Sequence, residues 1–140
     1  GAITLGTLDG ANIEIKEAAG DDNIVIFGMT TPEVNELKAR GYDSQQYFKN
    51  DSRINEAIER MYHGINGCTF VDVADSLRLR DPYMVLADFD SYRKAQQYIT
   101  ECYNDRMKWA KMSLNNIAGA GIFSADRAVT EYADNIWHLR

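Results

Sequence analysis

The chain has 140 residues, of which 45% are hydrophobic and only two are proline, a composition that suits one compact domain with one core. Its 21 acidic and 15 basic residues are interspersed and give a formal net charge of -6, which excludes the concentrated basic footprint of a nucleic-acid-binding protein. Neither a membrane-spanning apolar run nor a signal peptide is recognisable, so we expect no membrane partner.

A strand, a helix and a second strand are predicted for the first 28 residues. Residues 2–8 alternate small or apolar residues with Thr and Gly, and residues 23–28 form a short apolar run that ends at a glycine. Residues 12–19 between them are helix formers and stop at Gly20. This order predicts a right-handed parallel crossover, and therefore a small parallel sheet at the N-terminal edge of an α/β domain.

Residues 29–140 are predicted to be mostly helical. Thr31 as N-cap, followed by Pro32 and Glu33, begins a helix that should stop at Gly41. Two further helices are indicated by apolar residues three and four positions apart. Their stripes are Ile54, Ala57, Ile58, Met61 and Tyr62, stopped by Gly64, and then Phe70, Val73, Ala74 and Leu77.

The apolar residues 83–88 fit either a third strand or an extended connector, because Pro82 disfavours helix at Asp81. The last fifty residues have the clearest helical periodicity, and no repeat or linker divides the chain. Three helices are predicted, with stripes at Tyr92, Ala95, Ile99, Cys102 and Tyr103, at Met107, Ala110, Leu114, Ile117 and Ala118, and at Val129, Tyr132, Ala133, Ile136 and Trp137. Their expected N-caps are Asp90 or Ser91, Asn104 or Asp105, and Ser124.

The segment GTLDGAN, residues 6–12, joins the first strand to the helix after it, where phosphate-binding loops occur. It lacks the lysine and the glycine spacing of known phosphate-binding motifs, and Asp9 would repel an anion. These features favour a tight turn over an anion site. Gly6 and Gly10 would permit a close approach and a sharp reversal, Asp9 or Asn12 would cap the helix, and Asp9 would fasten the turn by accepting N–H bonds.

The histidines and cysteines form no recognisable catalytic set. His63 falls at the end of a helix and His138 near the end of the chain, so structural or solvent-exposed roles are expected for both. Cys102 lies on a core stripe and is expected to be an inert buried thiol, whereas Cys68 falls in a loop and could be exposed. Two isolated cysteines predict a reducing, cytosolic setting and no metal site.

Two other patterns have a functional and an ordinary interpretation. The pairs Asp21-Asp22 and Asp88/Asp90 could form a carboxylate dyad, but acidic pairs that flank turns are usually solvated caps. Aromatic residues at helical spacing usually belong to the core, yet a sugar-stacking surface is the alternative for Tyr98, Tyr103, Trp109 and Tyr132. The residues alone therefore predict no catalytic, cofactor-binding or metal-binding residue in the chain.

Several segments together resemble one protein family. GAITLGTLDGANIEI, IVIFG, ARGYD, DPYMVLADFDSYRKAQ, NIAGAGIFSADRAV and YADNIW follow one another as in the C-terminal end of the α-glucan (glycogen, starch or maltodextrin) phosphorylases. The interval 44–79 is less similar, while GTLDGAN and FSADR are specific at this separation. The resemblance implies that residues 1–140 are an incomplete, helix-rich C-terminal part of a Rossmann-like, GT-B type glycosyltransferase domain.

The activity implied by the resemblance belongs to a larger cytoplasmic parent enzyme. In this family orthophosphate cleaves terminal α-1,4-glucosidic bonds of a glucan and releases glucose 1-phosphate, with pyridoxal 5'-phosphate bound to a Schiff-base lysine. That lysine lies upstream of the position matching Gly1, and Lys16 lies outside the coenzyme motif. We therefore expect this chain alone to be an inactive fragment without coenzyme, in which GTLDGAN holds the wall of the parent's active site.

Two expectations concern partners. A sheet deprived of its preceding strands would expose an edge and an apolar face, which predicts self-association as a homodimer or larger. The resemblance also implies that the last helix, Ala125 to Trp137, packs partly across a domain boundary of the parent. The alternative to the family interpretation is a stand-alone helical module that binds a sugar or a protein.

Overall fold

The computed structural model describes residues 1–139, which form two compact units. The first unit combines Gly1–Ile26 with the chain from Ala95 onward, and the second is Phe27–Lys94. Helix α6, Phe89–Asn104, contributes residues to both. Because each unit buries its own apolar residues, each is described by itself.

The predicted strand-helix-strand order is confirmed at the start of the chain. Strands β1 (Leu5–Thr7) and β2 (Val25–Phe27) pair in a two-stranded parallel sheet, and both are shorter than predicted. Helix α1 (Ala11–Ala19) and the short 3-10 helix η1 (Asp21–Asn23) lie between them in sequence. The helix-rich chain with a small parallel sheet is therefore the predicted class of fold.

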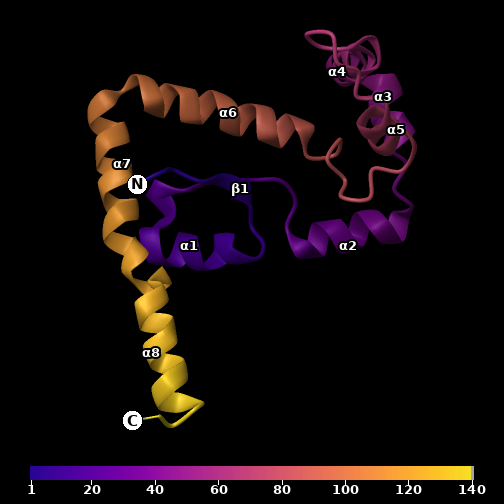
Figure 1. Cartoon of the computed structure of the whole chain (residues 1–140). Helices are drawn as coiled ribbons and strands as arrows, with labels where there is room; N and C mark the ends of the chain where they lie inside the picture. Colours follow the sequence, from indigo (N-terminus) through magenta and orange to yellow (C-terminus); the bar gives the residue numbers. More distant parts are fainter. Residues whose placement is uncertain (140) are drawn as a thin grey trace. The chain divides into compact units, whose positions relative to one another are not determined.

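The first unit is completed by α7 (Arg106–Gly119), the 3-10 helix η2 (Ala120–Phe123) and α8 (Ala125–Asn135), as Figure 1 shows. Helix α7 packs against α1 and η1. The side-chain amides of Asn115 and Asn116 donate to the side chain and the backbone carbonyl of Asn23, at 3.0 and 2.7 Å. These bonds tie α7 to the segment that leads into β2.

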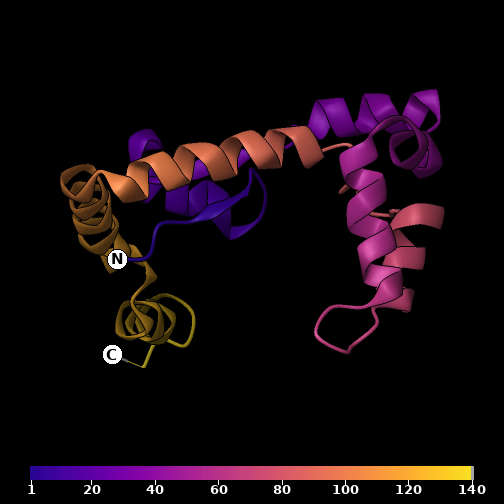
Figure 2. The same ribbon diagram turned by 90° about the horizontal axis from the view of Figure 1, so that it is seen from above.

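The second unit is a group of helices, seen together in Figures 1 and 2. It contains α2 (Thr31–Arg40), α3 (Ser44–Asn50), α4 (Ser52–His63) and α5 (Val71–Leu79). The core cluster consists of Ile54, Ile58, Ala74 and Leu86, with Met61 and Tyr62 packed against it. The stripe predicted for α4 is therefore confirmed except at Ala57, which is exposed. On α5 the stripe is only partly right, because Val73 is half exposed. Helix α3 was not predicted.

Residues 83–88 form a connector, as one of the two interpretations of the sequence had it, but the connector consists of turns and is not extended. Met84 and Leu86 are buried, whereas Tyr83 is 86% exposed. The connector is organised by Asp81, whose side chain is 1% exposed and whose φ is +37°. Its carboxylate accepts hydrogen bonds from the backbone N–H groups of Val85 (2.9 Å) and Leu86 (2.8 Å).

Some predicted helix starts are wrong by one or two residues. The N-cap of α2 is Thr30, one position before the predicted Thr31, and the Glu33 carboxylate accepts from both its N–H and its hydroxyl at 2.7 Å. Helix α6 begins at Phe89, which places Asp90 and Ser91 inside its first turn. The cause is the same in both cases: several adjacent residues are good caps, and tertiary contacts decide among them.

The other two N-caps were predicted at the right place. Asp105 caps α7 by accepting from the N–H groups of Met107 and Lys108, at 3.1 and 3.0 Å. Ser124 occupies the N-cap position of α8 without a side-chain hydrogen bond. Ser91 instead accepts from the N–H of Gly28 at 2.9 Å.

For the last two helices, the sequence predicted the wrong residues to be buried. On α7, Met112 is the buried residue, and on α8 no residue is buried. The large residues of the two predicted stripes are 51% to 80% exposed; they are Met107, Leu114, Ile117, Val129, Tyr132, Ile136 and Trp137. Of the three alanines in these stripes, Ala110 and Ala118 are exposed and Ala133 is half-buried. On α6, Ala95 and Cys102 are buried as predicted, but Tyr103 is 64% exposed.

Candidate functional site

The turn of residues 6–12 is a close-packed link between β1 and α1. A Cβ atom on Gly6 would lie 2.5 Å from Nδ2 of Asn12, so the close approach predicted there is confirmed. Gly10 has a φ of +48°, the left-handed region that glycine tolerates, and α1 begins at the next residue. The sharp reversal predicted at Gly10 is therefore also present.

The role predicted for Asp9 is wrong. No side chain caps α1; the backbone carbonyl of Asp9 accepts from the N–H of Asn12 at 3.1 Å, and its carboxylate accepts only from the Thr7 hydroxyl, at 3.1 Å. The side chain that fastens the turn is Asn12, whose Nδ2 donates to the Thr7 carbonyl at 2.8 Å. An amide can reach back to a carbonyl as a donor, which a carboxylate cannot do.

The histidines and cysteines lie where the sequence placed them. His63, at the end of α4, is exposed, and Nδ1 of His138, also exposed, lies 3.1 Å from the carbonyl of Asp134. Cys102 is fully buried and Cys68 is exposed. No group of three His, Cys, Asp or Glu side chains among residues 1–139 could hold a metal ion.

The two acidic pairs have separate local partners and lie in different units. Asp21 forms an ion pair with Lys16 at 3.0 Å. Asp88 accepts from the N–H of Met29 at 2.9 Å, and burial raises its pKa. Asp90 belongs to the ion-pair chain of Asp51, Arg53, Asp90 and Arg93 described below.

The four aromatic residues of the first unit are not a buried core. Tyr98, Tyr103 and Tyr132 are 43%, 64% and 51% exposed, so the core interpretation is wrong for them. Tyr103 meets Trp109 edge to face at 5.1 Å, and Lys108 lies 4.7 Å above the ring of Tyr98. A sugar-stacking role for this group stays a prediction.

A cavity of about 430 Å³ lies in the second unit, and we call it the α3 cavity because α3 supplies several of its lining residues. Two tyrosines, two amides and three carboxylates give it its chemical character: Tyr42, Tyr47, Gln46, Asn50, Asp43, Asp51 and Asp90. Ile54, Leu86 and Phe89 add apolar surface. In the sequence, Asp90 was singled out as a possible N-cap and as part of an acidic pair, Ile54 as a core residue and Leu86 as part of the apolar segment 83–88; the other side chains were not.

The aromatic part of the α3 cavity is held in place by Asp81. The hydroxyl of Tyr42 donates to Oδ2 of Asp81 at 2.6 Å. Burial, together with this hydrogen bond, raises the pKa of Tyr42 far above its ordinary value, so the phenol remains a donor at any physiological pH. The rings of Tyr42 and Tyr47 are tilted by 42° with their centroids 5.5 Å apart.

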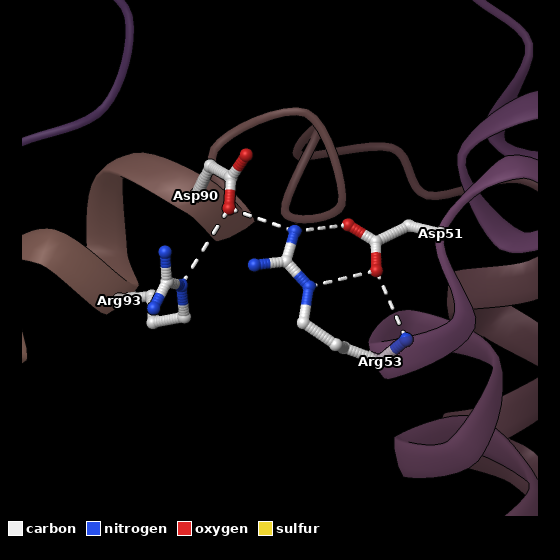
Figure 3. Close-up of polar contacts among 4 residues, drawn as sticks. All are labelled: Asp51, Arg53, Asp90 and Arg93. Carbon is white, nitrogen blue, oxygen red and sulfur yellow. Dashed lines mark hydrogen bonds and ion pairs between the residues drawn. The ribbon is translucent and has the colours of Figure 1, made fainter.

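The charged wall of the α3 cavity is a chain of alternating ion pairs, drawn in Figure 3. Arg53 lies between Asp51 and Asp90, and Arg93 lies on the other side of Asp90. Nε of Arg53 donates to Asp51 at 2.9 Å, its NH2 group pairs with Asp90 at 2.9 Å, and Nε of Arg93 is 3.6 Å from the same oxygen of Asp90. Two of the cavity carboxylates, those of Asp51 and Asp90, are thereby offset by guanidinium groups.

This ion-pair chain predicts a specific pH dependence. The Arg53 hydrogen bond lowers the pKa of Asp51 from its ordinary value near 3.8 to about 2. Because the folded-state pKa of Asp51 is depressed, the stabilisation is fully present above pH 4 and is lost as the pH falls toward 2.

We expect Arg53→Gln to be less stable than the native chain at pH 6. The difference in free energy of unfolding between the two proteins, measured by urea denaturation, should shrink between pH 4 and pH 2. The control is Arg60→Gln on the same helix, for which a constant difference is expected; a constant difference for Arg53→Gln too would contradict the assignment.

Comparison with known proteins identifies the family. The model of the carbohydrate phosphorylase family matches residues 1–139. The chain belongs to this family. It is 43% identical to a glycogen phosphorylase of Synechocystis sp. over its whole length, 40% identical to a glycogen phosphorylase of Haemophilus influenzae over 99% of its length, and 38% identical to the muscle form of glycogen phosphorylase of Rattus norvegicus over 99%.

The chain spans 17% of the length of each of these relatives, so it corresponds to a short segment of them. The family resemblance that the sequence indicated is thus confirmed. No lysine within residues 1–139 is buried. No helix in this part of the chain has the length and hydropathy needed to cross a membrane.

Proposed function

We propose that this chain is a C-terminal segment of an α-glucan phosphorylase. The parent would be a cytoplasmic glycosyltransferase that uses orthophosphate to cleave terminal α-1,4-glucosidic bonds of a glucan, releasing glucose 1-phosphate. The observation that carries the proposal is the match of the carbohydrate phosphorylase family along residues 1–139, together with relatives named glycogen phosphorylase that are 38% to 43% identical.

Within that parent we assign the chain a scaffolding role. Both parts of the chain would belong to a Rossmann-like, GT-B type domain. Residues 1–28 supply a strand-helix-strand edge of this domain, and residues 29–140 supply a mostly helical extension. The turn at Gly6, Gly10 and Asn12 then fixes the backbone of an active-site wall without reacting. In this proposal no residue of the chain is catalytic or binds a cofactor or metal.

Pyridoxal 5'-phosphate, the coenzyme that the family resemblance implies, does not fit the surroundings of Lys16 or Lys108. A Schiff-base lysine needs an environment that favours the neutral amine, such as burial. Lys16 is ion-paired with Asp21, and interactions with Cys102 and Tyr98 raise the pKa of Lys108. These contacts support our proposal that the coenzyme lysine of the parent is neither Lys16 nor Lys108.

The test of the proposed function is a phosphorolysis assay. The full-length parent and the 140-residue chain are incubated side by side with maltodextrin and orthophosphate, and glucose 1-phosphate and the coenzyme's absorbance are followed. We expect the parent to be active and coloured and the chain to be neither. A parent that is inactive on every α-glucan tried would refute the function, and an active isolated chain would refute the scaffolding role.

Self-association is the expected behaviour of the chain on its own. Large apolar side chains on α7 and α8 are more than half exposed, among them Met107, Leu114, Ile117, Val129 and Tyr132. Apolar surface of this extent favours association between copies. We expect a dimer or larger species by light scattering coupled to size-exclusion chromatography. A clean monomer with a cooperative melt at high temperature would contradict this.

A further inference from the structure

The α3 cavity combines aromatic rings with carboxylates. Its volume of about 430 Å³ falls within the range of roughly 300–1,000 Å³ usual for ligand pockets. Three aromatic and three acidic side chains line it, namely Tyr42, Tyr47, Phe89, Asp43, Asp51 and Asp90. Aromatic faces attract cations through their quadrupole, and carboxylates attract them by charge. Both kinds of group therefore favour a positively charged ligand, and the carboxylates oppose a phosphate or other anion.

One wall of the cavity already holds a cation in this way. The guanidinium carbon of Arg53 lies 5.4 Å from the centroid of the Phe89 ring. The same guanidinium pairs with Asp51 and, at 2.9 Å, with Asp90. Phe89 and these two carboxylates are therefore occupied by a residue of the chain itself. An incoming cation has to be bound by the other rings and by the remaining carboxylate of the cavity.

That remaining carboxylate belongs to Asp43. Three carboxylates line the cavity and two guanidinium groups, those of Arg53 and Arg93, pair with two of them, which leaves one negative charge. Within residues 1–139 Asp43 forms no ion pair. Its Oδ1 accepts the N–H of Gln45 at 3.0 Å, and its Oδ2 has no partner in that part of the chain. A monovalent cation would balance this charge.

The two tyrosine rings that line the cavity are held in place and are electron-rich. The rings of Tyr42 and Tyr47 are tilted by 42° with their centroids 5.5 Å apart, and both residues are half-buried, so part of their surface is open to a ligand. The Tyr42 hydroxyl donates to Oδ2 of Asp81 at 2.6 Å, which fixes this ring before any ligand arrives. Donation to a carboxylate also raises the electron density of the phenol ring, and such a ring attracts a cation more strongly.

The arrangement of these groups suits an alkylated ammonium better than a metal ion or a primary amine. No group of three His, Cys, Asp or Glu side chains within residues 1–139 could hold a metal ion. A primary ammonium is strongly hydrated and carries three donors, which one carboxylate does not satisfy. A quaternary ammonium has no N–H donor and is recognised by ring faces and charge alone. The exposed amides of Gln46 and Asn50, four residues apart on α3, remain available for a polar group of the same ligand.

From these features we propose that the α3 cavity binds a small trimethylammonium compound. Its alkylated nitrogen lies against Tyr42 and Tyr47 with Asp43 as the counter-ion, and a hydroxyl group elsewhere on the ligand meets the amide of Gln46 or Asn50. The lining residues all belong to the second unit and include none of the turn of residues 6–12. The site is therefore separate from the scaffolding role proposed above and does not depend on the activity of the parent.

A ligand-observed NMR titration of the full-length parent protein with choline tests the charge of the ligand. The neutral comparison is 3,3-dimethylbutan-1-ol, which has the shape of choline with carbon in place of the charged nitrogen. We expect choline to bind about tenfold more tightly than the alcohol, and its binding to weaken as the salt concentration rises. Equal binding of the two compounds, or no binding of choline, overturns the proposal.

Two variants with the same change of charge test the role of Asp43. Asp43→Asn removes the charge but keeps a good N-cap residue for α3, and Asp72→Asn makes the same change at an exposed position of α5 outside the cavity. We expect choline to bind about three- to tenfold more weakly to Asp43→Asn and as to the native protein in Asp72→Asn. Native choline binding in Asp43→Asn, or equal weakening in both variants, overturns the proposal.

Tyr47→Leu tests the aromatic contribution, because it removes a ring and keeps apolar volume. Choline is expected to bind about fivefold more weakly, while binding of the neutral alcohol stays as it was. Unchanged choline binding in this variant contradicts the assignment. Tyr47 packs against the core of the second unit, so the variant can melt early. In that case the comparison of Asp43→Asn with Asp72→Asn decides, since neither residue belongs to that core.

Discussion

Replacing Asp81 with alanine is expected to lower the free energy of unfolding by about 3–5 kcal/mol, because it leaves several donors in the second unit without an acceptor. The side chain is 1% exposed, and its carboxylate accepts from the Tyr42 hydroxyl at 2.6 Å and from the N–H groups of Val85 and Leu86. Water cannot replace an acceptor at so buried a position without opening the connector. The positive φ of Asp81 adds to the cost, since alanine tolerates it less well than aspartate does.

Urea denaturation followed by circular dichroism measures this effect, and two variants calibrate it. Tyr42→Phe removes one of the three hydrogen bonds and leaves the two backbone bonds, so a loss of about 1 kcal/mol is expected. Asp72→Ala, at an exposed position of α5, should change stability by less than about 0.5 kcal/mol. A loss for Asp81→Ala no larger than that for Tyr42→Phe would mean that the connector is not held by this carboxylate.

The parts of the fold that the sequence predicted are those that local chemistry decides. The helix stops at Gly20, Gly41 and Gly64 were predicted correctly, and each glycine has a positive φ. The N-cap Asp105 was predicted for the same reason, because a carboxylate beside free N–H groups is favourable wherever the helix lies. None of these features depends on a distant residue.

Helix α3 escaped prediction because it has no apolar stripe. Its sequence, SQQYFKN, is polar except for Tyr47 and Phe48, which pack against the core of the second unit. A local signal was nevertheless present: the carboxylate of Asp43 accepts from the N–H of Gln45 at 3.0 Å, as an N-cap does. Applying the capping rule to Asp43 would have indicated the helix.

The stripes of α7 and α8 show where apolar periodicity stops being informative. The spacing correctly predicted helices, but which face is buried depends on the element that covers it, and Met112 rather than Leu114 is buried on α7. The same limit applies to the α3 cavity. Asp51 and Asp90 are far apart in sequence, and in the fold both pair with the guanidinium of Arg53.

Replacing Gly119 with alanine is expected to destabilise the first unit by about 2 kcal/mol, the cost of overpacking a close contact. Gly119 is the last residue of α7, at the point where that helix meets α1. A Cβ atom there would lie 2.5 Å from the carbonyl oxygen of Ala18, 2.9 Å from its carbonyl carbon and 3.3 Å from Cα of Ala19. All three are backbone atoms, so no rotation of a side chain can relieve the clash, and the two helices must separate.

Gly121 provides a matched control for this substitution, since it lies two residues further on and a Cβ atom there would meet nothing within 4 Å. Gly121→Ala is expected to be neutral or slightly stabilising, because alanine has less backbone entropy to lose than glycine. At Gly119 the higher helix propensity of alanine stabilises the variant by roughly 1 kcal/mol, and this gain partly offsets the cost of the clash. A net loss in thermal or urea unfolding for Gly119→Ala alone therefore measures the α1–α7 contact itself. Equal stability of the two variants would mean that α1 does not approach α7 so closely, and that the strand-helix-strand edge is held to α7 by Asn115 and Asn116 instead.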